Sequence, residues 1–193
     1  MSDPDTAARA FDAQFRQRAP RLDIAAERPE HHDALRCLYA ACSPLAELLP
    51  EALIDLQFQS REATYRSTRP LAMRRVITHG SVTIARIIVD WQQPGASHGV
   101  DIAVHPEHRS TGAALAMLRA WLAVADAAQR QCTLDVIADN PAKRIYQRLG
   151  FVEQQSDPGA PFVFMVRPAA RPAEGHDSRG LAPSHRRGGS PSI

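Results

Sequence analysis

Between residues 21 and 167 the sequence alternates between strand-like runs and segments with helical periodicity, which limits the chain to folds that pack helices on a sheet. In the segment 31–42 the apolar side chains recur at i, i+3, i+4 and i+7, namely at Leu35, Leu38, Tyr39 and Cys42. Two β-branched runs meet at His79-Gly80 and predict a hairpin. The first half of this stretch therefore predicts a strand at 21–27, helices at 31–42 and 49–67, a hairpin over 71–91 and a strand at 98–105.

The second half begins with a loop of small residues, 109–114, that leads directly into a long helix. The apolar face of that helix comprises Leu115, Leu118, Trp121, Leu122 and Ala125. A strand at 132–138, a helix at 140–149 that Gly150 ends, and strands at 151–155 and 161–166 complete the pattern. The predicted order is β-α-α-β-β-β-α-β-α-β-β, which describes a single α/β domain with one mixed sheet.

Composition places the chain among ordinary soluble domains, because 44% of its 193 residues are hydrophobic and 23% are charged. A formal net charge of +2 gives no reason to expect nucleic acid or a membrane surface as a partner. No apolar run is long enough to cross a bilayer. We expect an N-terminal extension at 1–20 that is partly disordered or helical, the domain at 21–167, and a disordered tail rich in Pro, Gly, Ser and Arg at 168–193.

The cysteines and histidines do not have the spacing of a disulfide framework or a zinc site. Cys37, Cys42 and Cys132 lack CxxC spacing and a matching pair of histidines, which fits reduced thiols in a cytoplasm. The N-terminus has no positively charged start followed by an apolar run, so we expect a cytoplasmic protein without a signal peptide. His105 and His108 have no third ligand spaced to join them, so we expect surface residues and no metal.

The loop RSTGAA, from Arg109 to Ala114, has the features of an anion site. A helix N-terminus offers unpaired N–H groups and the positive end of its dipole, and small side chains let phosphate oxygens approach closely. Arg109 adds a charge-assisted contact. The loop matches neither GxGxxG nor GxxxxGK[ST], so Walker-type nucleotide hydrolysis is not supported. Taken alone, the loop is equally compatible with an ordinary strand–helix connection.

A second motif lies in LDVIADNPAKRIYQRLGF, residues 134–151. Asn140 and Pro141 stand at the head of a helix, Tyr146 is on its second turn, and Gly150-Phe151 stands at its end. Both motifs together, in this order and on matching elements, resemble the GCN5-related N-acetyltransferase (GNAT) superfamily. The resemblance covers roughly residues 21–167.

This resemblance implies that acetyl-coenzyme A is the cosubstrate. Its pyrophosphate would lie in the loop formed by Arg109, Ser110, Thr111, Gly112, Ala113 and Ala114. The main chain of Ala103 and Val104 would pair with the pantetheine arm like an added strand, in an opening between two splayed parallel strands, 100–104 and 134–138. Where this chain has Ser110 the family commonly has Gly, so the loop is less permissive here.

Acetyl transfer to an amine needs a neutral amine, a hydrogen-bond donor to the developing oxyanion and a proton for the leaving thiolate. By the resemblance Tyr146 supplies the proton; the alternative is a core tyrosine whose hydroxyl bonds a backbone carbonyl. Asn140 would contact the cofactor arm or only cap the next helix. The backbone N–H of Val104 is the expected oxyanion donor. Cys132 lacks a histidine nearby in sequence, so no covalent acyl-enzyme is expected.

The general base has several candidates. Asp135 resembles the acidic base of ribosomal-protein N-acetyltransferases, and His98 lies where histone-type members place a glutamate. A histidine there would titrate in a useful range. Asp101 and Glu47 are further candidates, and for each of the four a solvated surface group is the alternative. Water, or no dedicated base, also stays open.

The acceptor site is expected between the first two helices and the last hairpin, where Gln57, Phe58 and Arg61 would face a small-molecule or peptide amine, unless they only pack the helix onto the core. We therefore predict an acetyl-coenzyme A-dependent N-acetyltransferase that works by direct attack in a ternary complex. The alternatives are a catalytically silent coenzyme A-binding regulatory module, an acyltransferase that uses another acyl-coenzyme A, and a nucleic-acid binder that uses the arginines of the tail. A homodimer also stays open.

Overall fold

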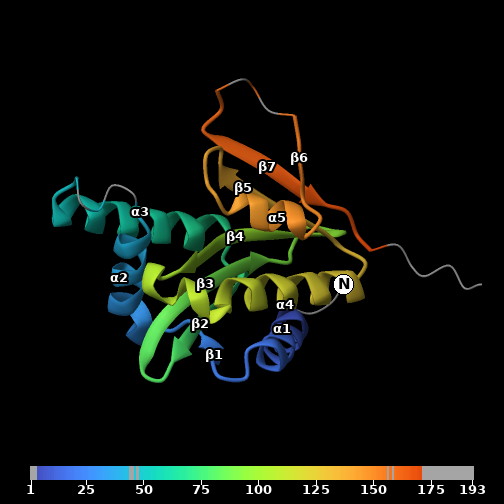
Figure 1. Ribbon diagram of the computed structural model, residues 1–193, viewed down its shortest axis with the longest axis horizontal. Coiled ribbons are helices and arrows are strands. Elements are labelled where there is room, and N and C mark those ends of the chain that lie inside the picture. The colour runs from blue at the N-terminus through green and yellow to red at the C-terminus, as the bar shows by residue number, and fades with distance from the viewer. Residues whose placement is uncertain (1–3, 44–45, 47, 156, 158, 171–193) are drawn as a thin grey trace, which may run out of the picture.

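The computed structural model describes residues 4–43, 46, 48–155, 157 and 159–170. Its elements, labelled in Figure 1, are α1 (Pro4–Arg18), β1 (Asp23–Ala26), α2 (His32–Cys42), α3 (Glu51–Thr68), β2 (Met73–His79), β3 (Val82–Asp90), β4 (Ala96–Val104), α4 (Ala113–Ala127), β5 (Gln131–Ile137), α5 (Lys143–Arg148), β6 (Val152–Glu153) and β7 (Phe162–Arg167). Short 3-10 helices η1 (Pro29–His31) and η2 (Pro106–Thr111) precede α2 and α4. After α1, the order of strands and α-helices is the predicted one.

Among the described residues, seven strands form one sheet in the order β1-β2-β3-β4-β5-β7-β6. Neighbouring strands run antiparallel except β4 and β5, which run parallel because α4 carries the chain back between them. The mixed sheet is therefore confirmed, and its parallel pair lies near the centre.

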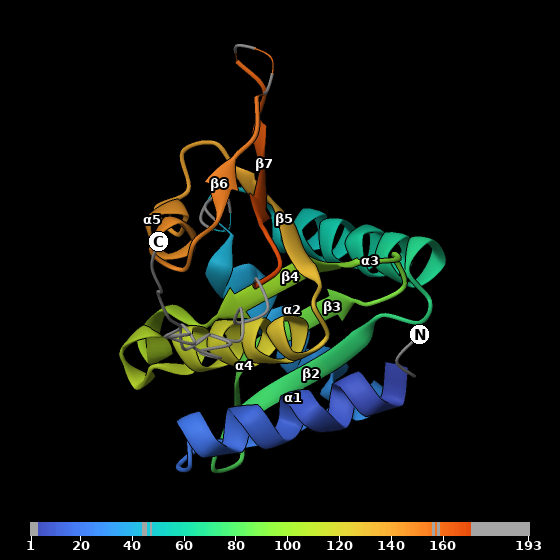
Figure 2. The same cartoon turned by 90° about the vertical axis from the view of Figure 1, so that its right-hand side faces the viewer.

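Helices cover both faces of the sheet. α1, α4 and α5 lie on one face and α2 and α3 on the other, as Figures 1 and 2 show from two sides. The larger core forms on the first face, around Trp121 and Met117 of α4. The smaller core forms on the second face, where Phe58 of α3 meets Leu35, Leu38 and Val76. β3 is buried on both faces, as expected of a β-branched run in the middle of a sheet.

The N-terminal helix α1 belongs to the core of the domain. Phe11 and Phe15, one helical turn apart, are fully buried in the larger core with residues of α4. Asp12 between them pairs with Arg75 of β2 at 2.8 Å. Of the two states predicted for residues 1–20, the helical one is found at 4–18, and with its two buried aromatic rings this helix packs into the domain.

Two further expectations concern the chain ends and membranes. Residues 171–193 of the predicted tail lie outside the described residues. Within the described part of the chain, none of the helices has the length and apolarity needed to cross a membrane.

Replacing Phe15 by Ala should lower the free energy of unfolding by about 3–5 kcal/mol, because it removes a fully buried ring from a packed core. Arg16→Ala is the matched control on the same helix, since Arg16 is exposed and its loss should change stability by less than about 0.5 kcal/mol. Chemical denaturation measures both. Equal unfolding midpoints for the two variants would show that α1 does not unfold with the domain.

Candidate active site

The parallel strands β4 and β5 part along their length. They pair only over Ala96–Gly99 and Gln131–Leu134. Further along, β4 stays paired with β3 as far as Val104, and β5 stays paired with β7 as far as Ile137. The two strands therefore leave an opening between 100–104 and 135–137, which confirms the predicted splay.

Gly99 lies where the strands begin to part. A Cβ atom at this position would lie 2.8 Å from the ring of Trp121, so any other residue would force a shift. The register with β3 also changes here, because Ile88 lies opposite Asp101 while Val89 lies opposite Gly99. The extra residue, Val100, forms a bulge, and a bulge bends the strand that carries it. This bend accounts for the departure of β4 from β5.

Beyond the bulge, alternate residues of β4 turn their backbone groups toward the opening. The N–H of His105 donates to the carbonyl of Ile84 in β3 at 2.8 Å. By the alternation of an antiparallel ladder, Ala103 also points to β3, whereas Ile102 and Val104 point away from it, toward β5. The backbone N–H of Val104, the expected oxyanion donor, therefore faces the opening. By the same alternation, the backbone groups of Ile102 face the opening and those of Ala103 do not.

The loop after β4 ends in a tight turn, which places the N-terminus of α4 at the end of the opening. Pro106–Thr111 form η2, and Gly112 begins α4 with a φ of 79°, a left-handed conformation that favours glycine. The side chains of Arg109, Ser110 and Thr111 are exposed. The predicted loop is therefore accessible to a ligand.

The first turn of α4 has unpaired N–H groups. The Ala113 N–H donates to Thr111 Oγ1 at 3.3 Å, but the N–H groups of Ala114 and Leu115 have no partner among the described residues. The first turn contains no acidic side chain. With Arg109 beside it, this helix N-terminus offers the donors and the positive potential that an anion needs.

His105, Glu107 and His108 bring three ligand atoms within 4.8 Å of one another in the described loop. The sequence argument that no third ligand accompanies the two histidines is therefore wrong, because η2 places Glu107 between them. Nδ1 of His105 already accepts the backbone N–H of Glu107 at 3.4 Å, and Glu107 is exposed. The turn itself accounts for this grouping.

Tyr146 on α5 is 8% exposed, with its ring edge-on to Phe151 at 5.9 Å between centroids. Its hydroxyl has no hydrogen-bond partner among the described residues and is not one of the fully enclosed polar atoms, so the backbone-carbonyl role considered for it is not found. Burial raises the pKa of Tyr146 to about 12, and the Asp101 carboxylate acts in the same direction. The phenol is therefore protonated at neutral pH and can act as a donor.

Asn140 caps the turn before α5. Its Oδ1 accepts the backbone N–H of Ala142 at 2.9 Å. The capping role considered for it is thus present, although α5 begins only at Lys143. Cofactor contact through its amide group stays a prediction.

His98 and Asp135 lie side by side on the sheet face opposite α4. His98 Nδ1 lies 2.9 Å from Thr133 Oγ1, and that hydroxyl donates to the carbonyl of Ser97 at 3.4 Å. Because the Thr133 hydroxyl donates to Ser97, its oxygen accepts a hydrogen bond from Nδ1–H, and Nε2 is then the unprotonated nitrogen of a neutral imidazole. Nε2 faces Asp135, with Oδ2 at 3.7 Å.

The charge state of His98 is set by its surroundings. Burial lowers the pKa of His98, and the positive charge of Arg69 lowers it further, while Asp135 and Asp90 oppose both effects. Because the net shift is downward from 6.5, the imidazole is neutral at pH 7 and can accept a proton.

Asp101, a further candidate for the base, is already fully engaged. One carboxylate oxygen accepts from Arg61, and the other accepts from Arg86 Nε at 2.8 Å. Arg86 also pairs with Glu62 at 2.6 Å and lies 3.7 Å from Glu27. Both oxygens of Asp101 are thus occupied by guanidinium groups. Glu47, the remaining candidate, lies outside the described residues.

The residues predicted to bind the acceptor divide into two groups. Phe58 is 1% exposed in the smaller core, so it is a packing residue and cannot contact an acceptor. Gln57 is exposed and accepts a hydrogen bond from Tyr39 at 3.3 Å. Arg61 is half-buried, held by Asp101 and by the Tyr65 hydroxyl at 2.7 Å. Gln57 and Arg61 border the same face of β4 as Asp101 and stay predictions.

Two cysteines differ in their access to the opening. Burial raises the pKa of Cys132 to about 11, so its thiol is not a nucleophile at neutral pH. Cys42, which sequence reasoning assigned only to a helix face, places Sγ 3.4 Å from the carbonyl of Val104. It therefore lies beside any ligand that pairs with Val104. Only the packing of α2 on β4 reveals this contact.

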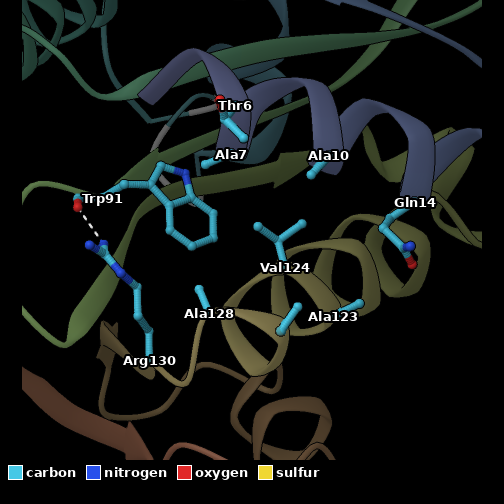
Figure 3. Close-up of a pocket in the computed structure, with 10 residues that line it drawn as sticks. Thr6, Ala7, Ala10, Gln14, Trp91, Ala123, Val124, Ala128 and Arg130 are labelled. Atoms are coloured by element: carbon cyan, nitrogen blue, oxygen red, sulfur yellow. Dashed lines mark hydrogen bonds between the residues drawn. The ribbon is translucent and has the colours of Figure 1, made fainter. Parts of the chain in front are cut away.

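A separate hollow of about 260 Å³ lies between α1 and α4 (Figure 3). Figure 3 shows alanine side chains and the ring of Trp91 around it, with Arg130 at the edge bonding the Trp91 carbonyl. It borders the C-terminal half of α4, through Ala123 and Val124, whereas the loop 109–114 leads into the first turn of that helix. The hollow is therefore not part of the candidate site.

Comparison with known proteins agrees with this geometry. Residues 74–153 match the family described as "Acetyltransferase (GNAT) domain". The PaiA N-acetyltransferase of Thermoplasma acidophilum, solved with coenzyme A, has a TM-score of 0.59 and 16% identity over 76% of this chain and 98% of its own. The ribosomal-protein-S18-alanine N-acetyltransferase of Escherichia coli has a TM-score of 0.56 and 19% identity over 80% of this chain and 97% of its own.

A third similar structure is yncA of Salmonella typhimurium, solved with its cofactor acetyl-CoA, with a TM-score of 0.54 and 16% identity over 79% of this chain and 96% of its own. A comparison with curated proteins gives no match. The sheet with its splayed parallel pair, followed by a helix whose N-terminus is free to hold an anion, is the fold that this chain shares with these acetyltransferases. By its family match the segment 74–153 is a GNAT acetyltransferase domain, and the chain shares its fold with solved acetyltransferases.

Ser110→Glu should weaken coenzyme A binding by about tenfold or more, because it places a negative charge beside the unpaired N–H groups of α4. Ser110→Gln is the matched control, since it adds nearly the same bulk without the charge. Gly112 is a poorer test position, because its φ of 79° would strain any other residue. Isothermal titration calorimetry with coenzyme A measures the affinities. Equal weakening by Glu and Gln would show that the loop does not face a phosphate.

Proposed function

We propose that this protein is an acetyl-coenzyme A-dependent N-acetyltransferase that transfers the acetyl group to a primary amine by direct attack in a ternary complex. The observation that carries the proposal is the opening between β4 and β5, with the N–H groups of Ile102 and Val104 unpaired by a neighbouring strand along one side and the N-terminus of α4 at its end. An extended chain that ends in phosphates would satisfy both features.

The residues present fit coenzyme A. Ile102 and Val104 would pair with the amide-containing pantetheine arm, and Val104 would also offer its N–H to the oxyanion of the transferred acetyl group. The N–H groups of Ala114 and Leu115, with Arg109, would hold the pyrophosphate. When bound, acetyl-coenzyme A supplies an acetyl group activated as a thioester.

Asp135 and His98 suit the handling of the incoming amine. An alkylamine is a cation at neutral pH and must lose a proton before it can attack. The half-exposed carboxylate of Asp135 would bind the ammonium group, and the free Nε2 of His98, 3.7 Å away, would accept its proton. The neutral imidazole set by burial makes this transfer feasible at pH 7.

Tyr146 suits the proton donation to the leaving sulfur. The N–C bond forms as the C–S bond breaks, and the Tyr146 hydroxyl would give its proton to the thiolate. The second amine proton restores the phenol, and the first is released to solvent from His98, so the net products are the amide, the free thiol of coenzyme A and one proton. The unpartnered hydroxyl of Tyr146 supports this role.

A broad panel of primary amines, monitored for free thiol in the presence of acetyl-coenzyme A, tests the proposal. Thiol release that depends on one class of amine would support an N-acetyltransferase. Coenzyme A binding without release on any amine would instead support a regulatory module of the same fold, and release only with a longer acyl donor would support a different acyltransferase.

Tyr146→Phe should lower kcat by about tenfold to a hundredfold while leaving the affinity for acetyl-coenzyme A within about twofold, since only the proton donor is lost. The ring of the phenylalanine keeps the packing on Phe151. Steady-state kinetics and calorimetry measure the two quantities. An unchanged kcat would mean that Tyr146 is only a core residue.

The pH dependence of kcat/KM should follow His98 on its acid side. The lowered pKa places the loss of activity below pH 6.5 as the imidazole becomes protonated, so that activity is full above this value and falls as the pH falls. His98→Gln should remove this acid limb and lower kcat/KM by about tenfold to a hundredfold. An acid limb that persists in the variant would exclude His98 as the base.

The phenol of Tyr146 should add no alkaline limb. Its pKa of about 12 keeps it protonated throughout the usual assay range. A fall in kcat centred near the ordinary tyrosine value of about 10, absent in Tyr146→Phe, would contradict the buried environment described for it.

A further inference from the structure

Three large apolar side chains are exposed together on the outer face of β5 and β7, at Ile137 (51%), Phe162 (56%) and Phe164 (40%). Val163 and Met165, the intervening residues of β7, are buried in the larger core. Because side chains alternate along a strand, Phe162 and Phe164 both project from the face opposite α5. Ile137 lies directly opposite Phe162 in the register, so it shares this face. We name these three side chains the β7 aromatic patch.

The β7 aromatic patch is continuous with the candidate active site. Asp135 lies directly opposite Phe164 in the same register, and its carboxylate is 3.7 Å from Nε2 of His98. The Asp135 side chain is 54% exposed. A molecule whose amine reaches His98 therefore rests against the patch with its remaining atoms.

The charges of this face favour a cation beside the patch. His98 is neutral, and Arg61, the nearby cation of α3, is already paired with Asp101. The carboxylate of Asp135 consequently has a negative charge to offer to an ammonium group. Aromatic rings add to this preference, because their faces attract cations.

The dimensions of the patch limit what it can cover. Neighbouring strands lie about 4.8 Å apart, and residues i and i+2 of one strand lie about 7 Å apart. The surface bounded by Ile137, Phe162 and Phe164 is thus about the size of one six-membered ring. The Cβ atoms of Asp135 and Phe164, which lie directly opposite each other, are about 5 Å apart. An amine held by Asp135 and a ring resting on Phe164 would therefore be joined by one or two methylene groups.

From these observations, and resting on the proposed N-acetyltransferase function, we propose that the acceptor is a small primary amine with a ring-sized apolar group one or two carbons from its nitrogen. Asp135 binds the ammonium group and the β7 aromatic patch covers the apolar group. Phe162, Phe164 and Ile137 are then the residues that determine acceptor specificity.

The test compares 2-phenylethylamine with ethanolamine, which have similar spacing but differ in apolar area, as acceptors for acetyl-coenzyme A. The wild-type protein should favour 2-phenylethylamine in kcat/KM by about tenfold or more, the size expected from burying part of a phenyl ring. Phe164→Ala and Phe162→Ala should each bring the ratio of the two kcat/KM values toward one, and Phe164→Leu should restore part of it. Val82→Ala, an exposed apolar side chain on the β2–β3 hairpin, should leave the ratio unchanged.

The outcomes separate this inference from the function on which it rests. No thiol release with any amine would overturn the N-acetyltransferase proposal itself. Release that is equally efficient with ethanolamine, or unaffected by Phe164→Ala, would overturn only the acceptor assignment. Faster acetylation of a peptide N-terminus than of 2-phenylethylamine would also overturn it. The acceptor assignment would also be overturned if the wild-type protein were a dimer and the substitution Phe162→Asp dissociated it. The patch would then be an interface between copies of the chain.

Discussion

The separation of β4 from β5 is the constraint on which the rest of the site depends. A sheet normally pairs every backbone group of an interior strand, and an unpaired buried group is costly. Here Gly99 against Trp121 and the bulge at Val100 bend β4 away after a few paired residues. The N–H groups of Ile102 and Val104 are left without a strand partner near the middle of the sheet, and the Val104 carbonyl accepts only from the Cys42 thiol. A ligand that completes the ladder gains those hydrogen bonds, and the N-terminus of α4 at the end of the opening gives the same ligand an anion site.

Electrostatics then divides the acidic and basic groups around the opening into structural and reactive ones. Arg86 and Arg61 hold Asp101, and Glu62 completes the network, so these charges fix α3 against β3 and β4. Asp135 and His98 are not held in this way. One is a half-exposed carboxylate, and the other is a neutral imidazole whose tautomer is set by Thr133. Tyr146 enters from the opposite face with its hydroxyl unpartnered, so proton acceptor and proton donor lie on opposite faces of the parting strands.

Local patterns in the sequence were sufficient for the order of elements and for the loop from Arg109 to Ala114, because periodicity and turn chemistry are short-range properties. Strand pairing, which joins residues far apart in the chain, decides the details that local patterns do not predict. The backbone groups of Ile102, and not those of Ala103, face the opening. The hydrogen bond from His105 to Ile84 fixes which residues of β4 point toward β3. The network around Asp101 joins residues far apart in the chain, so no spacing rule finds it. For Phe58 the sequence allowed either contact with an acceptor or packing on the core, and the structure shows packing. For α1 a signal was present in the sequence: Phe11 and Phe15 are one turn apart, although the surrounding residues are polar.

The central claim is that an extended cofactor completes the ladder along the free edge of β4. Backbone amide exchange, followed by nuclear magnetic resonance with and without coenzyme A, tests it most directly. We expect the amides of Ile102 and Val104 to gain protection when coenzyme A is added, whereas the amide of Ala103, already paired with β3, should change little. Unchanged exchange at Ile102 and Val104 in a protein saturated with coenzyme A would contradict the claim.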